Sequence, residues 1–149
     1  MFFRNETHLK STALILTSCA GLLTGCVNFP KTESTEDLGS GFHHDVIAER
    51  TANSTESVGH FDYLFYRDQR LGRSRKFAVA PSGQSIIYQD AVSGNVFVFK
   101  RNRNVTRQLT STFPGEVDRF VWDKGERLVT ASMVPKDNRM QKRRFPIPD

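Results

Sequence analysis

Cysteine and long apolar runs are both scarce in this chain of 149 residues. Its 2 cysteines, Cys19 and Cys26, lie near the start, which excludes a disulfide framework across the rest of the chain. No apolar run reaches the roughly 20 residues that a membrane-spanning helix needs. A mean hydropathy of -0.46 also excludes a polytopic membrane protein. The length suits one ordinary domain at most.

Common catalytic and nucleotide-binding motifs are missing as well. The sequence contains no Gly-x-Ser-x-Gly elbow, no His-Glu-x-x-His zinc helix, no Walker loop and no dinucleotide-binding fingerprint. His43, His44, Asp45 and His60 have side chains that suit zinc or copper. Because the adjacent histidines have no helical i, i+4 partner, we interpret this segment as solvated. The sequence therefore predicts no enzyme activity, no metal and no cofactor.

The first 26 residues have the pattern of a secretory signal. Arg4 and Lys10 make the start positive, and residues 11–23 are small or apolar without a charge. That run is too short to span a bilayer but suits the apolar region of a signal peptide. An ordinary secreted protein, or a cysteine buried in an apolar run, is the alternative interpretation.

The segment Leu23-Thr24-Gly25-Cys26 resembles the lipobox of bacterial lipoproteins. The resemblance implies that residues 1–25 are removed as a signal peptide and that Cys26 carries a diacylglyceryl group and palmitate-type acyl chains. A second, weaker box ends at Cys19. The residue after Cys26 is Val27 rather than Asp, which in such lipoproteins favours the outer membrane. We therefore expect a lipid anchor on the periplasmic face of the outer membrane, with the inner membrane as the alternative.

Residues 26–57 are predicted to form a lipidated, flexible tether. Ser, Thr, Glu, Gly and Asn dominate residues 28–57, with no sustained period of 2 or 3.6. Such a segment buries too little apolar area to offset its chain entropy. As a loose coil it would span about 30 Å and hold the folded part clear of the lipid headgroups.

Residues 58–134 are predicted to form an all-β antiparallel domain. Short aromatic and β-branched runs alternate with turn residues such as Pro81-Ser82-Gly83 and Asp123-Lys124-Gly125. The expected strands cover residues 61–66, 76–80, 85–89, 96–99, 105–109, 119–122 and 127–130. The expected core residues are Phe65, Phe77, Val79, Ile87, Val96, Val98, Phe120 and Trp122.

An internal repeat lies within this domain. Residues 77–87 match residues 120–129 with one deletion, at the spacing of about 40–45 residues that is typical of a propeller blade. The segments FAVAPSGQSIIYQD, GNVFVFK and VTRQLT resemble one repeat of the WD40-like propellers of the periplasmic TolB type. Ser82 and Gln84 depart from the Asp and Lys that are usual in that family.

The resemblance covers residues 77–110 well and residues 117–131 in part, and residues 61–72 resemble the end of an earlier blade. A propeller closes with typically 4–8 blades, whereas this domain supplies fewer than two. Three arrangements follow from that shortage: a small blade-like pair of sheets, a sandwich or meander, or several chains packed together.

Residues 135–149 are predicted to be a mobile basic tail, since Pro135, Pro146 and Pro148 disfavour a long helix or a central strand. The sequence pI is about 9.5. An exported, anchored chain does not meet genomic nucleic acid, so lipopolysaccharide phosphates, lipid headgroups or an acidic protein surface are the expected anionic partners. A solvated basic surface is the alternative. The candidate anion-binding residues are Arg101, Arg103, Arg107, Lys142, Arg143 and Arg144.

These features together predict a non-enzymatic envelope lipoprotein that acts as a protein-binding or scaffold module. Sheet edges carry unpaired N–H and C=O groups that can recruit an envelope protein or a second copy of the chain. One alternative is a binder of anionic envelope components. The other is a small-ligand or enzymatic module whose Asp and His residues come together only in the fold.

Overall fold

The computed structural model describes residues 30–50, 58–113, 115–134 and 140–149. Within these ranges every regular element is a β-strand, and no helix is present that could cross a membrane. The strands are β1 (Lys31–Gly39), β2 (Phe42–Arg50), β3 (Val58–Tyr66), β4 (Gln69–Arg73), β5 (Lys76–Val79), β6 (Ser85–Gln89), β7 (Val96–Lys100), β8 (Val105–Gln108), β9 (Val117–Trp122), β10 (Leu128–Met133) and β11 (Lys142–Pro146).

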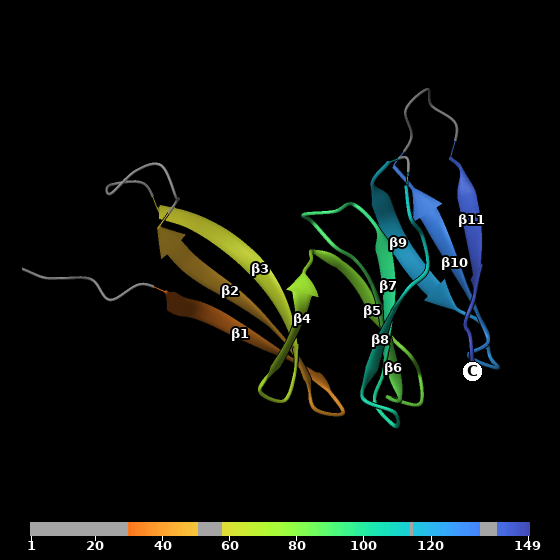
Figure 1. The fold of residues 1–149 in the computed structure, drawn as a ribbon, viewed down its shortest axis with the longest axis horizontal. Coiled ribbons are helices and arrows are strands. Elements are labelled where there is room, and N and C mark those ends of the chain that lie inside the picture. Colours follow the sequence, from red (N-terminus) through yellow and green to blue (C-terminus); the bar gives the residue numbers. More distant parts are fainter. Residues whose placement is uncertain (1–29, 51–57, 114, 135–139) are drawn as a thin grey trace, which may run out of the picture.

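The strands form three antiparallel sheets, each a meander in which a strand pairs with the next one along the chain (Figure 1). The first sheet contains β1–β4, the second contains β5–β8, and the third contains β9–β11. Short turns join β1 to β2, β3 to β4, β5 to β6 and β9 to β10, as expected for antiparallel pairs. The predicted all-β antiparallel class is confirmed. The sequence predicts fewer than two blades, whereas the described residues form three sheets.

The second sheet lies between the other two, and its strand β6 shows why. All five residues of β6 are buried, because side chains alternate between two covered faces. Ile86 and Tyr88 pack with Phe42 and Leu64 of the first sheet. Ile87, on the opposite face, packs with residues of the third sheet, including Phe120, Val129 and Ala131. The core therefore consists of two apolar layers, one on each side of the second sheet.

The internal repeat extends to all three sheets. Ser40, Gly83 and Glu126, spaced 43 residues apart, have φ angles of 56°, 70° and 53° and occupy the first hairpin turn of their sheets. These turns lie along one edge of the molecule, at the bottom of Figure 1. The φ angles align Gly83 with Glu126, 43 residues apart, so the one deletion inferred from the sequence is not needed up to this turn. The repeat unit keeps its length through the turn.

The predicted tether is wrong for residues 30–50, which form the hairpin of β1 and β2. Strand β2 pairs with β3 from Phe42 to Arg50, and Phe42 is fully buried. Average composition missed this hairpin because β1 is an exposed edge strand, rich in Thr and Glu, that needs few apolar residues. Residues 26–29 and 51–57, Cys26 and the signal segment lie outside the described residues.

The predicted mobile tail is wrong for residues 142–146, which form β11 along the edge of β10. Phe145 is buried in the core shared by the second and third sheets. Pro146 ends this edge strand, where the lack of an N–H group costs no ladder hydrogen bond. Residues 135–139 lie outside the described residues.

Most of the expected core residues contact the core. Ile87, Val96, Val98 and Phe120 are buried as predicted. Phe77, Val79 and Trp122 are half-buried against the apolar layers. Phe65 instead lies on the face of the first sheet turned away from the second sheet, because its neighbour Leu64 points into the core.

Candidate functional site

A cleft of about 420 Å³ opens between the first and second sheets. Two backbone hydrogen bonds hold its walls together: the Ser74 N–H donates to the Asp62 carbonyl at 3.0 Å, and the Ala91 N–H donates to the Arg73 carbonyl at 2.7 Å. Its lining includes cations, carboxylates and an aromatic ring: His60, Phe61, Asp62, Arg73, Arg75, Lys76, Asp90 and Glu116.

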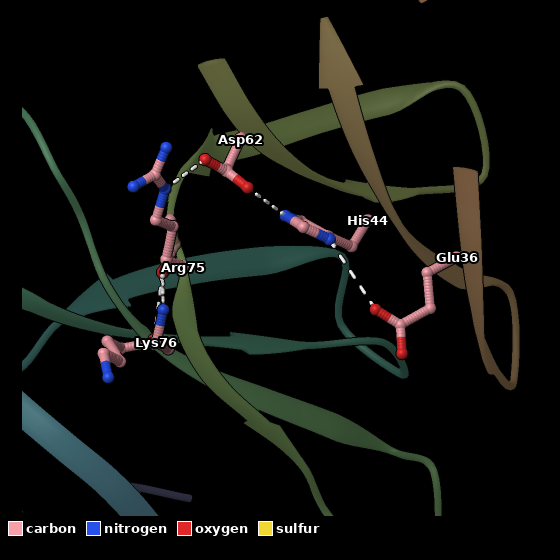
Figure 2. A network of polar contacts seen from close by, with 6 residues as sticks. Glu36, His44, Asp62, Arg75 and Lys76 are labelled. Atoms are coloured by element: carbon pink, nitrogen blue, oxygen red, sulfur yellow. Dashed lines mark hydrogen bonds and ion pairs between the residues drawn. The ribbon is translucent and has the colours of Figure 1, made fainter. Parts of the chain in front are cut away.

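A polar network borders this cleft (Figure 2), and Asp62 is at its centre. One oxygen of Asp62 lies 3.1 Å from Nε2 of His44, and the Arg75 guanidinium donates to the other oxygen. The second ring nitrogen of His44 lies 3.7 Å from Glu36. The hydrogen bond and charge of Asp62 raise the pKa of Arg75. The network joins the otherwise exposed β1 to the segment that leads into β5.

Other polar side chains of the cleft form hydrogen bonds with the turns that surround it. Asp90 accepts hydrogen bonds from the backbone N–H and the hydroxyl of Ser93, both at 2.8 Å. The amide group of Gln89 donates to the carbonyls of Gly94 and Gly115 and accepts from the Val117 N–H. Among the described residues no three His, Cys, Asp or Glu side chains gather as metal ligands. The cleft therefore offers a recess that is lined by both cationic and acidic residues.

The predicted anion-binding residues of the β7–β8 region belong to the second sheet, and those of β11 belong to the third. Arg101 donates to the Ser40 carbonyl at 3.3 Å, so it links a turn of the second sheet to a turn of the first. Arg103 lies in the exposed turn between β7 and β8, and Arg107 lies on the exposed edge strand β8. Their chemistry is that of a solvated basic edge.

The basic residues of β11 point to both faces of the third sheet. The Arg143 guanidinium lies 5.3 Å from the ring centre of Phe113, on the face that packs against the second sheet. Lys142 and Arg144 lie on the opposite face, which we call the outer face of the third sheet. Register places Lys142 and Arg119 on either side of Ser132, so this face carries three exposed cations.

Sequence reasoning missed Arg119 as a member of this group. Its signal was the alternation within residues 119–122, where Phe120 and Trp122 point to the core and Arg119 and Val121 point away. The side chain of Val121 is 51% exposed, which marks the outer face as uncovered by the described elements.

An aromatic surface lies on the outer face of the first sheet, which is the face turned away from the second sheet. His43 stacks on Phe65 with ring centres 4.9 Å apart and planes 2° apart. The Tyr63 hydroxyl donates to Glu49 at 2.9 Å, and burial and this hydrogen bond raise the pKa of Tyr63. Asp45 lies beside Tyr63 in the register of β2 and β3.

Two guanidinium groups already stack on this aromatic surface. Arg73 lies 3.9 Å from the ring centre of Phe61, and Arg70 lies 5.0 Å from that of Tyr63. Asp45 is only 8% exposed, and its Oδ1 is the one buried side-chain polar atom without a hydrogen-bond partner in the described part of the chain. The sequence interpretation of His43, His44 and Asp45 as solvated tether residues is wrong, because β2 holds all three in the sheet.

No family model and no curated protein sequence matches this chain. Its structure is similar to an acylaminoacyl peptidase of Pyrococcus horikoshii, with a TM-score of 0.47 and 8% identity. The similarity covers 70% of this chain and 17% of the peptidase chain, so the match spans about a sixth of that protein's length. A likeness at this level says nothing of the activity of this chain.

Proposed function

We propose that this chain is an envelope lipoprotein, anchored through Cys26 at the periplasmic face of the outer membrane, and that it acts as a non-enzymatic protein-binding or scaffold module. The observation that carries the proposal is the stack of three sheets with two outer faces. Within the described residues, no strand covers the face with His43 and Tyr63 or the face with Arg119 and Val121. Uncovered sheet faces with aromatic and arginine side chains suit protein contacts.

The repeat supports a propeller-like assignment for the stack. The 43-residue spacing of Ser40, Gly83 and Glu126 is the period of one blade of the WD40-like, TolB-type repeats that the sequence resembles. In each described sheet the first hairpin turn contains a residue of positive φ at this spacing, and consecutive sheets pack face to face. Propeller repeats are built for repeated face-to-face packing, which leaves the first and last sheets of an open array available to a partner.

Affinity capture of the lipidated full-length chain from crosslinked membranes tests the proposal. At low and at high salt we expect one envelope protein to be recovered in fixed proportion, because buried apolar contacts are little screened. The chain with Val121→Glu on the outer face should lose most of this partner, whereas the chain with Val92→Glu, a similarly exposed valine in the β6–β7 turn, should keep it. Recovery of neither an envelope protein nor a second copy of the chain by any of the three chains contradicts the proposal.

A second candidate function is binding of an anionic envelope polymer or lipid headgroup. The observation that favours it is the group of Arg119, Lys142 and Arg144 on one exposed face. Capture of phosphorylated glycolipid alone, lost as the Debye length falls to about 3 Å near 1 M salt, would support this function instead.

A further inference from the structure

We propose that two copies of this chain associate head to tail, with the outer face of the third sheet of one copy on the outer face of the first sheet of the other. The two contacts would close a ring of six sheets. This inference rests on the proposed function, since it names a second copy of the chain as one partner of the uncovered faces.

Each outer face corresponds, through the 43-residue repeat, to a face of the second sheet that is buried inside the stack. On the outer face of the third sheet, Thr130 lies 43 residues after Ile87, which packs against the next sheet. On the outer face of the first sheet, His43 and Asp45 lie 43 residues before Ile86 and Tyr88, which pack against the preceding sheet. Stacking a second copy therefore continues an interface that the chain already makes twice.

The outer face of the third sheet supplies the cations of this contact. Arg119 and Lys142 lie in one row with Ser132, and Arg144 lies in the next row with Thr130 and Val121. No acidic side chain shares these two rows. Two such faces would repel each other, because each carries three exposed positive charges. This surface therefore favours a different face of the partner over a copy of itself.

The outer face of the first sheet supplies acceptors and aromatic rings. The buried Oδ1 of Asp45 has no hydrogen-bond donor, its Oδ2 lies 3.8 Å from Nε2 of His43, and the carboxylate of Glu49 lies four residues further along the same strand. The rings of Phe61 and Tyr63 already accept guanidinium groups from Arg73 and Arg70. Because both arginines come from β4, we place the partner's cations on the opposite, β1–β2 side, where the carboxylates lie.

The number of copies follows from the number of sheets. A head-to-tail contact closes into a ring when the rotation allows it and otherwise grows into a filament. Propellers close with typically 4–8 blades, so two copies with three sheets each give a ring of six. Three copies would give nine, outside that range.

Disulfide trapping in the oxidising envelope tests this geometry with the full-length chain. One chain carries Val121→Cys on the outer face of the third sheet, and a second carries Ile47→Cys on the outer face of the first. Co-expression should give a crosslinked pair that contains one of each chain. Each variant alone should stay at the background set by the unsubstituted chain, which contains Cys19 and Cys26.

Two further variants complete the test. Arg119→Glu in the Val121→Cys chain should reduce the crosslinked pair by at least several-fold. Arg103→Glu, a matched change in an exposed turn of the second sheet, should leave it unchanged. A chain with both cysteines should give a two-chain product, whereas a ladder of longer products would overturn the closed ring. Absence of the mixed pair, or self-crosslinking by the Val121→Cys chain, would overturn the head-to-tail contact.

The capture experiment separates this inference from the proposed function. Recovery of an unlike envelope protein without the mixed crosslink would overturn the inference and leave the scaffold function standing. The mixed crosslink without any other captured protein would uphold the inference and confine the binding function to self-association.

Discussion

At the scale of single residues, the turn edge depends on how closely Gly83 approaches Ser40. A Cβ atom added at Gly83 would lie 2.0 Å from the Ser40 hydroxyl, and the φ angle of 70° disfavours any other residue. The neighbouring Ser82 donates two hydrogen bonds of 2.6 Å to Glu126 of the next turn. Gly83 thus allows the first and second of these turns to approach closely, and the hydrogen bonds from Ser82 to Glu126 join the second to the third.

Gly83→Ala should therefore destabilise the protein more than Gly94→Ala. Gly94 has a φ angle of 72° but nothing within 4 Å of its added Cβ, so its substitution costs only backbone strain, about 1–2 kcal/mol. Gly83→Ala adds a steric clash, which we expect to cost a further ~1–3 kcal/mol. Urea unfolding followed by Trp122 fluorescence measures the difference.

Ser40→Gly in the Gly83→Ala chain provides the control, because it removes the clashing side chain while leaving the strain at residue 83. The double variant should approach the stability of Gly94→Ala. Equal stability of the two single alanine variants would show that the turns of the first and second sheets do not touch.

Tyr88 of β6 packs in the apolar layer between the first and second sheets and makes stability depend on pH in the alkaline range. Burial, with the charge of Asp90 as the second cause, raises its pKa from 10.0 to about 12. Between these values the unfolded chain releases the tyrosine proton while the folded chain keeps it. Stability from this group is therefore complete below pH 10.0 and is lost as the pH rises towards about 12.

Tyr88→Phe should remove this part of the alkaline loss. Below pH 10.0 the variant should be less stable than the parent by about 0.5–1.5 kcal/mol, because the hydroxyl donates to the Leu71 carbonyl. Near pH 12 the difference should shrink, since only the parent loses stability through this group. Urea unfolding at several pH values measures the gap; a gap that stays constant with pH would contradict the assignment.

At the scale of elements, the β1–β2 hairpin is the part of the fold that composition conceals. Its attachment to the second sheet depends on Phe42, whose ring centre lies 6.0 Å from that of Phe99 in β7. Within the first sheet, the same ring lies 5.2 Å from that of Tyr66. The polar network of His44, Asp62 and Arg75 supports the same contact from the cleft side. Together with the ladder between β2 and β3, this apolar anchor and this charged cluster hold the hairpin, whose outer strand β1 is exposed.

Phe42→Ala should cost about 3–5 kcal/mol of the free energy of unfolding, the range for a fully buried aromatic side chain. Phe65→Ala, on the outer face of the same sheet, should cost less, about 0.5–1.5 kcal/mol for the ring contacts with His43 and Tyr63. Thermal unfolding of both variants makes the comparison. A Phe42→Ala chain as stable as the parent would mean that the hairpin contributes nothing to the core.

Element order also decides which strands are free to pair. The exposed edges of the described sheets include β1, which is rich in charged side chains, and β8, all four residues of which are exposed. Charged side chains on an edge strand discourage uncontrolled pairing with other chains. For this reason the sheet faces, rather than the sheet edges, are the surfaces to which we assign specific contacts.

At the scale of the whole molecule, the proposed lipid anchor at Cys26 would define where the stack operates. Cys26→Ser should leave a full-length precursor that takes up no fatty-acid probe, because the expected acceptor sulfur is gone. Cys19→Ser should be labelled like the parent. Gel mobility with a labelled fatty acid measures both, and labelling of Cys26→Ser but not of Cys19→Ser would move the anchor to Cys19.

The sequence by itself determined the all-β class and the 43-residue repeat, because both depend on residues that are close along the chain. Turn residues such as those around Gly83, and strands with β-branched or aromatic residues such as Ile86 and Ile87, act locally. The outer-membrane anchor at Cys26 and the binding function also came from sequence patterns, and they stay predictions.

The tertiary structure alone decided which residues gather. Asp62 meets His44 and Arg75, and Arg119 joins Lys142, only after strands far apart in the sequence have paired in a particular register. A shift of one residue would turn each of these side chains to the other face, and no local pattern specifies that choice. The β1–β2 hairpin and β11 went unrecognised for the same physical reason: each is an edge element stabilised by one buried ring and a neighbouring strand, not by its own composition.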